Sequence, residues 1–297
     1  MPGARGGGGP AGDLGRRVPE VHRPADRRRG GGGLGVRPHR RLGEDAVSEL
    51  NAVWALVLRE VKIYVREKER IIAILVSPLL FLFVMGRGLS GVSPAPGFDY
   101  QQFIFPGILC MVILFTAITY GLYIIWDKRL DFLKEVLAAP ISRSTLFFGK
   151  ALGGMAGAVV EAFILLLIGA FFILPIGPLQ MLAALALSTL FAFLLAGIGL
   201  GLGARMKSME GFGLVMSFLT WPMFFFSGAL FDLTQAGPLL RWAALLDPFT
   251  YCVDLMRRVL LGWSVFPWPA DLAAVLAFSA LAAVWGVLSF GRLQQTR

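Results

Sequence analysis

Six apolar stretches, each long enough to cross a bilayer as a helix, constrain this chain more than any other sequence feature. A membrane's hydrocarbon core needs about 20 mostly apolar residues of α-helix to span it. The stretches are residues 71–89, 103–125, 151–174, 179–204, 211–231 and 272–290. Lipid offers the backbone no hydrogen-bond partners, so each stretch must be helical. The sequence therefore predicts an all-α integral membrane protein with six transmembrane helices.

The overall composition agrees with a membrane protein and excludes several other classes. Hydrophobic residues make up 56% of the 297 residues, and only 16% are charged, whereas soluble proteins carry about 25%. Cys110 and Cys252 lie in different kinds of segment, so they predict neither a disulfide framework nor a metal site. The spans offer no set of partners for a nucleophile, which argues against an intramembrane enzyme.

The first 50 residues form a separate region, predicted to be a disordered extension rich in Gly, Arg and Pro. It lacks the apolar core of a signal peptide. Its ten Arg against six acidic residues would suit anionic lipid or nucleic acid. A solvated tail is the simpler interpretation, and no specific nucleic-acid partner is predicted. A translation start near Val47 is an alternative.

Residues 51–70 are predicted to form an amphipathic helix in the membrane interface, directly before the first span. Its apolar residues recur at helical spacing, while its charged residues fall elsewhere on the helical wheel. The apolar set is Trp54, Val57, Leu58, Val61, Tyr64 and Val65. An ordinary surface helix packed on protein is the alternative.

The distribution of Lys and Arg predicts that both termini are cytoplasmic. With the N-terminus inside, the cytoplasmic pieces from residue 51 onward carry 14 basic residues and the outer pieces carry 4. The 71–297 region is therefore expected to form one six-span domain. The segment between the second and third spans faces the cytoplasm in this topology.

That segment, "DKRLDFLKEVLAAPISRSTLFFGK" (127–150), has a pattern suited to protein contact. On a helix, Asp127, Asp131 and Glu135 form an acidic stripe, and leucines line another side. Like charges four residues apart repel mildly, and a basic partner would relieve that repulsion. A short amphipathic helix close to a bilayer suits docking into a groove of a soluble protein. A solvated connector is the alternative interpretation.

Four ordered motifs resemble those of ABC-2 type exporter permeases. They are "FLKEVLAAPISR" (132–143) followed by "GK", "FIFPGIL" (103–109), "FFFSGALFDL" (224–233) and "LLDPFTYCVDLMRRVLLG" (245–262). The resemblance covers about residues 50 to 295. Asp131 is a departure, since such permeases often have glycine there.

The resemblance implies a permease that works with a separate ATPase subunit and a second permease copy, a homodimer being favoured over a heterodimer. The cytoplasmic segment would be the coupling helix that inserts into the ATPase. Its expected contact residues are Asp127, Asp131, Leu133, Lys134, Glu135, Leu137, Pro140 and Arg143. No G-x-x-x-x-G-K-[ST] motif occurs, so ATP and Mg²⁺ are expected in the partner subunit and no cofactor in this chain.

The substrate of such an exporter is expected to be hydrophobic or amphipathic, such as a drug-like natural product or a lipid-linked glycan. Export would proceed across the cell membrane. Candidate substrate-path or gating residues are Glu161, Trp221, Phe224, Phe225 and Phe226. Glu161 is a lone acid near mid-membrane, where charge is costly. A neutral, packed acid is the simpler interpretation, and a secondary transporter that uses Glu161 is the alternative function.

The outer stretch 237–263 and the glycine-rich stretch 197–203 each allow a structural prediction. Pro248 should divide the outer stretch 237–263 into two short helices, and Asp254 and Arg258 could pair on one face. The resemblance implies a re-entrant pair that caps the exit, with Pro248, Tyr251, Asp254 and Arg258 as an outer gate; a fixed interfacial scaffold is the alternative. In "GIGLGLG" (197–203), interleaved G-x-x-x-G pairs predict close helix packing.

Overall fold

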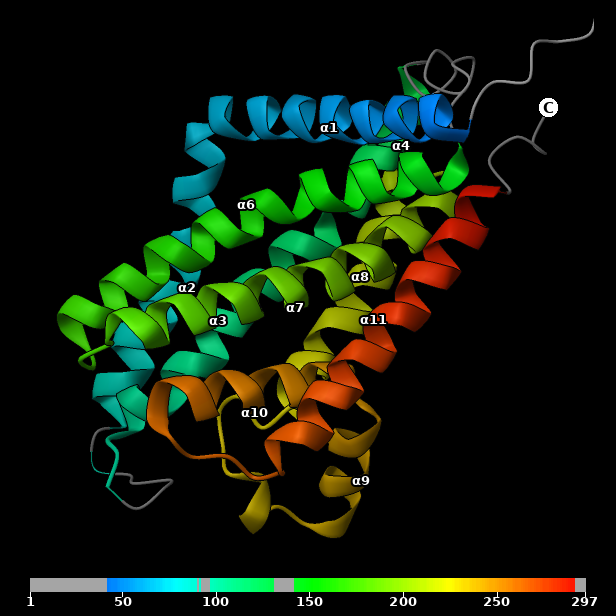
Figure 1. The fold of residues 1–297 in the computed structure, drawn as a ribbon. Coiled ribbons are helices and arrows are strands. Elements are labelled where there is room, and N and C mark those ends of the chain that lie inside the picture. The colour runs from blue at the N-terminus through cyan, green and yellow to red at the C-terminus, as the bar shows by residue number, and fades with distance from the viewer. Residues whose placement is uncertain (1–41, 90, 92–96, 131–141, 292–297) are drawn as a thin grey trace, which may run out of the picture. The chain divides into compact units, whose positions relative to one another are not determined.

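The computed structural model describes residues 42–89, 91, 97–130 and 142–291. Within these ranges the fold consists of helices and connecting turns, with no strand, which confirms the all-α class. The helices, drawn in Figure 1, are α1 (Leu42–Arg66), α2 (Lys68–Gly88), α3 (Tyr100–Thr119), α4 (Gly121–Arg129), α6 (Arg143–Phe172), α7 (Pro178–Arg205), α8 (Met209–Phe226), the 3₁₀ helix η1 (Leu233–Gln235), α9 (Pro238–Leu246), α10 (Pro248–Leu261) and α11 (Trp268–Gly291).

Six helical segments in the described ranges are long and apolar enough to cross a membrane, as predicted. They are α2, α6, α7, α8, α11 and the combined length of α3 and α4, which meet at Tyr120. The orientation of these segments in the bilayer and the re-entrant placement of α9 and α10 stay predictions.

Several boundaries differ from the predicted ones for local reasons. α1 begins at Leu42, inside the region predicted to be disordered, and its Glu49 side chain binds the start of α6. α6 begins at Arg143, where the Ser142 hydroxyl accepts a hydrogen bond from the Thr145 amide and caps the helix. α8 ends at Phe226, because the chain turns sharply there and Gly228 adopts a φ of 73°.

α3 is the central helix of the described fold. In its most apolar window 78% of the residues are buried, against 22–44% in the other five spans. It packs against α2, α6, α7, α8 and α10. A helix that is apolar all round belongs in the interior, and the uncharged sequence of α3 agrees with that place.

The predicted close packing at the glycine-rich end of α7 is confirmed, and the two interleaved pairs serve opposite faces. A side chain at Gly199 would overlap the Ile118 carbonyl oxygen of α3, and one at Gly203 would overlap that of Gly121 in α4. The other pair, Gly197 and Gly201, faces Ala282 and Trp285 of α11. α7 therefore lies in close contact with two spans at once.

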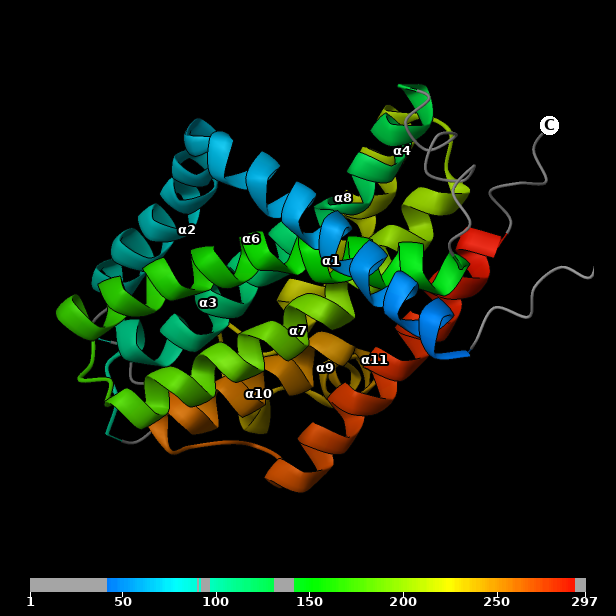
Figure 2. The same cartoon turned by 45° about the horizontal axis from the view of Figure 1, so that its top comes forward.

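A second glycine series joins α1 to α6, and the two helices lie against each other in both views (Figures 1 and 2). Gly149, Gly153 and Gly157 repeat every four residues along α6. A Cβ atom at these glycines would come within 2.6 to 2.7 Å of side-chain atoms of Leu56, Glu60 and Tyr64, which repeat every four residues along α1. Small residues at this spacing let helix backbones approach closely, so α1 lies in a groove of α6.

Candidate functional site

The predicted coupling segment is described only at its two ends. Its residues Asp131, Leu133, Lys134, Glu135, Leu137 and Pro140 lie outside the described residues. Asp127 belongs to the last turn of α4, and Arg143 is the first residue of α6. The two flanks of this segment therefore belong to described helices, α4 and α6.

Four charged side chains form a buried ion cluster beside these flanks. Lys150 of α6 donates to Glu60 Oε1 of α1 at 2.7 Å and also to Asp127 Oδ2 of α4. Arg59 donates to the same two acids, at 2.6 Å to Glu60 and at 3.3 Å to Asp127. Lys150 is fully buried, and Glu60 and Asp127 are 3% and 5% exposed. The cluster joins α1, α4 and α6 through two cations and two anions.

The placement of Asp127 on an exposed acidic stripe was therefore wrong. Its carboxylate is buried and bound by Lys150 and Arg59, because three helices converge on it. The helical wheel of 127–143 considers only residues within that segment, whereas the partners of Asp127 come from 23 and 68 residues away. Lys150, the last residue of the segment 127–150 considered above, lies inside α6.

Burial and the neighbouring cations shift the pKa of Glu60 in opposite directions. Desolvation alone would raise the pKa of the Glu60 carboxyl, but the charge and hydrogen bond of Lys150, with help from Arg59, hold that pKa below its ordinary value. Glu60 is therefore ionised at neutral pH.

The neighbouring Lys128 connects α4 to the end of α7. Its ammonium group donates to the carbonyl oxygens of Gly203, Ala204 and Met206 at 2.9, 2.7 and 3.0 Å. The last carbonyls of a helix have no partner within the helix and carry partial negative charge. Lys128 thus caps the C-terminus of α7, so side chains at the end of α4 bind three other helices, α1, α6 and α7.

The second flank, at the start of α6, is bound by a side chain of α1. The Glu49 carboxylate accepts a hydrogen bond from the Ser142 amide at 3.0 Å and another from the Thr145 hydroxyl. A carboxylate at a helix N-terminus is favoured by the orphan amides and the helix dipole. The Thr145 and Ser142 hydrogen bonds, the former the larger influence, lower the pKa of Glu49.

Glu161 is fully buried where α1, α3 and α6 meet. The Tyr64 hydroxyl donates to its Oε1 at 3.0 Å, and the Thr116 hydroxyl donates to its Oε2 at 2.5 Å. Both carboxyl oxygens thus have partners, one from each neighbouring helix. Hydrogen bonds to both oxygens offset the cost of burying this polar group in mid-membrane.

The predicted aromatic set divides between interior and exterior. Phe224 is 1% exposed and belongs to the core, whereas Trp221, Phe225 and Phe226 are 42–48% exposed. Trp221 packs against Phe225 and against Phe115 of α3, with ring centroids 5.8 and 5.2 Å apart. Three of the four aromatic residues are therefore available to lipid, to substrate or to a second chain.

The outer stretch folds into two short helices, α9 and α10, divided at Pro248 as predicted. Pro248 is the first residue of α10, a position where its missing N–H costs nothing, and Asp247 caps the helix by accepting from the Phe249 amide at 2.9 Å. The Tyr251 hydroxyl donates to the Leu245 carbonyl at 2.7 Å. Side-chain bonds thus tie α10 to the end of α9.

The predicted Asp254–Arg258 pair does not form. Asp254 instead accepts hydrogen bonds from the backbone amides of Val265 and Phe266 at 2.8–3.0 Å. Arg258 donates to the Ser264 hydroxyl at 3.0 Å. The loop that leads into α11 supplies the hydrogen-bond partners of both side chains. Helical spacing within α10 does not contain information about that loop.

Arg257 is a residue that the sequence pattern did not single out. It is 1% exposed, lies 4.1 Å over the ring of Phe103, and donates to the Gly228 carbonyl at 2.9 Å. Burial lowers its pKa to about 10, against the opposing charges of Asp254 and Asp232. Arg257 therefore stays charged at neutral pH and joins α10 to α3 and to the turn after α8.

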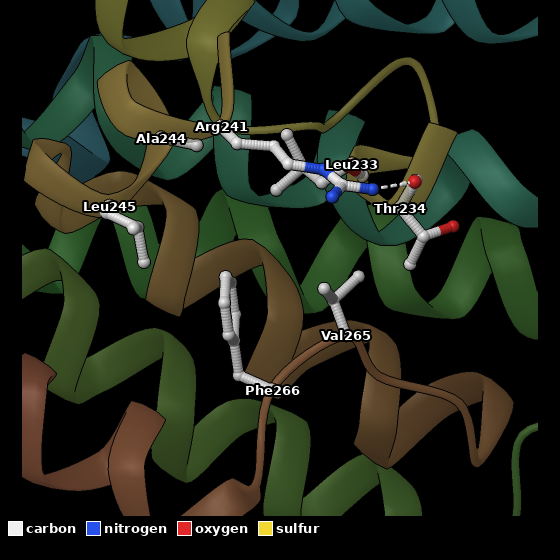
Figure 3. A pocket seen from close by; sticks show the side chains of 7 residues that line it. All are labelled: Leu233, Thr234, Arg241, Ala244, Leu245, Val265 and Phe266. Carbon is white, nitrogen blue, oxygen red and sulfur yellow. Dashed lines mark hydrogen bonds between the residues drawn. The ribbon is translucent and has the colours of Figure 1, made fainter. Parts of the chain in front are cut away.

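A small hollow of about 280 Å³ lies beside these outer helices, between η1, α9 and the loop before α11. Figure 3 shows Arg241 reaching across it toward Leu233 and Thr234, while Phe266 and Leu245 point into it from opposite sides. Arg241 donates to both backbone carbonyls, at 3.0 Å for Leu233. Its guanidinium group is thus engaged in holding the turn.

Comparison with known proteins decides between the functional classes. A family model described as ABC-2 type transporter matches residues 51–261, which include the predicted coupling segment, the ion cluster and all of α10. The chain belongs to the ABC-2 type transporter family. The transporter class inferred from the sequence is thereby confirmed.

Two of the three relatives compared with this ABC-2 protein below are named as permeases. The chain is 24% identical to the inner membrane transport permease YadH of Escherichia coli K12 over 253 residues, 82% of this chain and 95% of that protein. It is 27% identical to the putative transport permease ycf38 of Cyanophora paradoxa over 209 residues, 66% of this chain and 70% of that one. Nodulation protein J of Rhizobium leguminosarum bv. trifolii is 26% identical over 202 residues, covering 64% and 74%.

Proposed function

We propose that this chain is the membrane-spanning subunit of an ATP-driven exporter, working with a separate ATPase subunit and a second permease copy in the cell's inner membrane. The observation that carries the proposal is the ion cluster of Arg59, Glu60, Asp127 and Lys150, in a chain of the ABC-2 type transporter family. The cluster lies beside both ends of the segment proposed to bind the ATPase.

The cluster offers a physical route for ATP-driven motion into the membrane. A displacement of the segment 131–141 must act on α4 and α6, which precede and follow it directly. The ion pairs of Lys150 with Asp127 and Glu60 resist separation of α4, α6 and α1, because a buried charge left without its partner is costly. The three helices are thus expected to move together when the ATPase closes.

The proposed substrate is hydrophobic or amphipathic, with a drug-like natural product and a lipid-linked glycan as the two leading classes. Support comes from the apolar spans and from the exposed aromatic side chains of Trp221, Phe225 and Phe226 on α8. Two copies would enclose a route that six helices could hardly form alone. Export follows from the proposed orientation, with the coupling segment in the cytoplasm.

The first test is recovery of the partner. The tagged chain is purified from its native membranes in mild detergent, and stoichiometric partners are identified by mass spectrometry. A soluble ATPase with a Walker A motif is the expected partner. Leu133→Asp and Glu135→Lys should abolish its recovery, because both change the proposed contact surface.

Two controls separate docking from coupling. Glu210→Lys changes an exposed acid at the start of α8 and should leave ATPase recovery unchanged. Lys150→Met should retain the ATPase but uncouple its ATP hydrolysis from export in proteoliposomes. The proposal fails if no ATPase copurifies under any salt or detergent condition, or if the Glu210 variant loses it equally.

A second candidate, a secondary transporter, draws support from the buried contacts of Glu161 with Tyr64 and Thr116 of two other helices. Buried acids in spans are frequent in proton relays. The two candidates differ in energy source: ATP-driven export survives collapse of the proton gradient in proteoliposomes, whereas proton-coupled export stops.

A further inference from the structure

A second hollow, which shares no lining residue with the hollow of Figure 3, lies between α7, α10 and α11. It has a volume of about 660 Å³ and is lined almost wholly by apolar side chains, among them Ala186 of α7 and Leu272 of α11. Arg258 of α10 is the charged residue in its lining, and Trp268 lies at the start of α11. We call this hollow the α7–α11 groove.

The groove opens toward the surface of two predicted spans, so its surroundings are lipid. Both α7 and α11 are long and apolar enough to cross the bilayer. Trp268 is 51% exposed at one end of α11, and exposed tryptophans collect at the boundary between acyl chains and headgroups. Ala183 and Ala186, which line the α7 wall, are small, so a chain can lie between the helices. These features fit an acyl chain.

Arg258 supplies the polar end of this site. Its predicted acidic partner, Asp254, is occupied by the amides of Val265 and Phe266. One Arg258 nitrogen donates to the Ser264 hydroxyl, which leaves donors of its five N–H groups for another acceptor. Guanidinium groups bind phosphate oxygens with two parallel hydrogen bonds.

The other charged groups near Arg258 leave it room for an anion. Asp271 is fully buried in the first turn of α11 and acts on Arg258 electrostatically, but no ion pair joins them within the described part of the chain. Asp254 is also buried, and Arg257 points away toward Phe103. Arg258 is therefore the exposed cation at the groove.

We propose that the α7–α11 groove binds one membrane phospholipid, with an acyl chain between the helices and the phosphate on Arg258. The bound lipid would fill the space between α10 and the two spans and hold α10 against them. This binding is independent of the exported substrate, so its test measures lipid retention and leaves the proposed function untouched.

Native mass spectrometry of the purified full-length chain tests this site with defined lipids. The delipidated protein is titrated with dioleoylphosphatidylglycerol, and in parallel with dioleoylglycerol, which has the same chains but no phosphate. We expect one tightly retained phosphatidylglycerol and little dioleoylglycerol. Arg258→Gln should reduce phosphatidylglycerol binding about tenfold, the loss of one charge-assisted phosphate contact, whereas Arg258→Lys should keep a large part of it.

Matched variants separate the groove from the general membrane surface. Ala186→Phe fills the groove and should abolish retention, whereas Ala280→Phe, on an exposed position of α11 outside the lining, should not. Arg87→Gln removes an exposed cation at the end of α2 and is the control for Arg258→Gln.

Several outcomes would overturn the proposal. Equal retention of the two lipids, or an unchanged affinity in Arg258→Gln, would show that no phosphate binds there. An equal loss in Arg87→Gln would reduce the effect to bulk charge. If Ala186→Phe does not fold, the comparison of Gln and Lys at position 258 still decides the matter.

Discussion

The buried ion cluster makes a quantitative prediction at Lys150. Lys150→Met removes the cation that contacts both Glu60 and Asp127, and leaves two buried carboxylates to share Arg59. Removing one partner of a buried ion pair costs about 3–5 kcal/mol, because the remaining charge keeps its desolvation penalty. For a chain of 297 residues, whose unfolding entropy is about 0.6 kcal/mol/K, that corresponds to a decrease in Tm of about 5–8 °C.

The same reasoning predicts a rescue. Adding Asp127→Asn to Lys150→Met removes one of the two acids and leaves the Arg59–Glu60 pair, 2.6 Å apart, balanced in charge. The double variant should therefore be more stable than Lys150→Met alone, although it carries one more substitution. Lys207→Met, which removes an exposed cation at the end of α7, should change stability by at most about 0.5 kcal/mol.

The chain carries its own probe for this measurement. Its two cysteines, Cys110 and Cys252, are free and buried at 1% and 0% exposure, so a thiol-reactive fluorophore labels them only as the protein unfolds. Melting curves of the four proteins in one detergent give the comparison. If the double variant loses as much stability as both single variants together, charge balance does not hold the cluster together and the reasoning is refuted.

Three further predictions concern stability, measured by thermal melting, and the first also concerns export, measured in proteoliposomes. Glu161→Gln should keep stability and export, whereas Glu161→Leu leaves the Tyr64 and Thr116 hydroxyls unpaired, at about 1–3 kcal/mol each; loss of export in the Gln variant would favour the proton-coupled alternative. Burial raises the pKa of Asp247 to about 7, so between about pH 4 and pH 7 the folded state binds more protons than the unfolded state. Stability should therefore fall as pH rises from 5 to 8. Asp247→Asn, which keeps the cap of α10, should make stability less dependent on pH in that range. Gly199→Ala should destabilise the protein, because a Cβ there overlaps the Ile118 carbonyl, while Gly213→Ala, with nothing within 4 Å, should not.

The spans could be predicted from sequence because lipid makes one physical requirement dominate. Every backbone amide in a span must bond within its own helix, so apolar length alone indicates the six segments. The division at Pro248 was equally local, since proline is favoured in the first turn of a helix. Such features depend on neighbours within a few residues.

The ion cluster could not be predicted, because its members are far apart in the chain. Asp127 and Lys150 are separated by 23 residues, and Glu60 and Lys150 by 90. From the sequence alone, each of these three residues resembles a surface charge beside a span, because their burial results from the packing of helices distant in the chain. The spacing of Gly149, Gly153 and Gly157 could have predicted close packing of α6 against another helix, since the same spacing in α7 did predict close contact.

The contacts between α1 and α6 suggest why α1 is more than a surface helix. Glu49, Glu60 and Tyr64 each place a polar group on α6, at its N-terminal cap, at Lys150 and at Glu161. Successive turns of α1 also lie in the glycine groove of α6, where a sliding motion would bring large side chains against backbone. The two helices are thus fixed in register by hydrogen bonds and by shape. A force applied at the start of α6 should therefore reach Glu161 through two packed helices, which would make that buried acid sensitive to events at the proposed coupling segment.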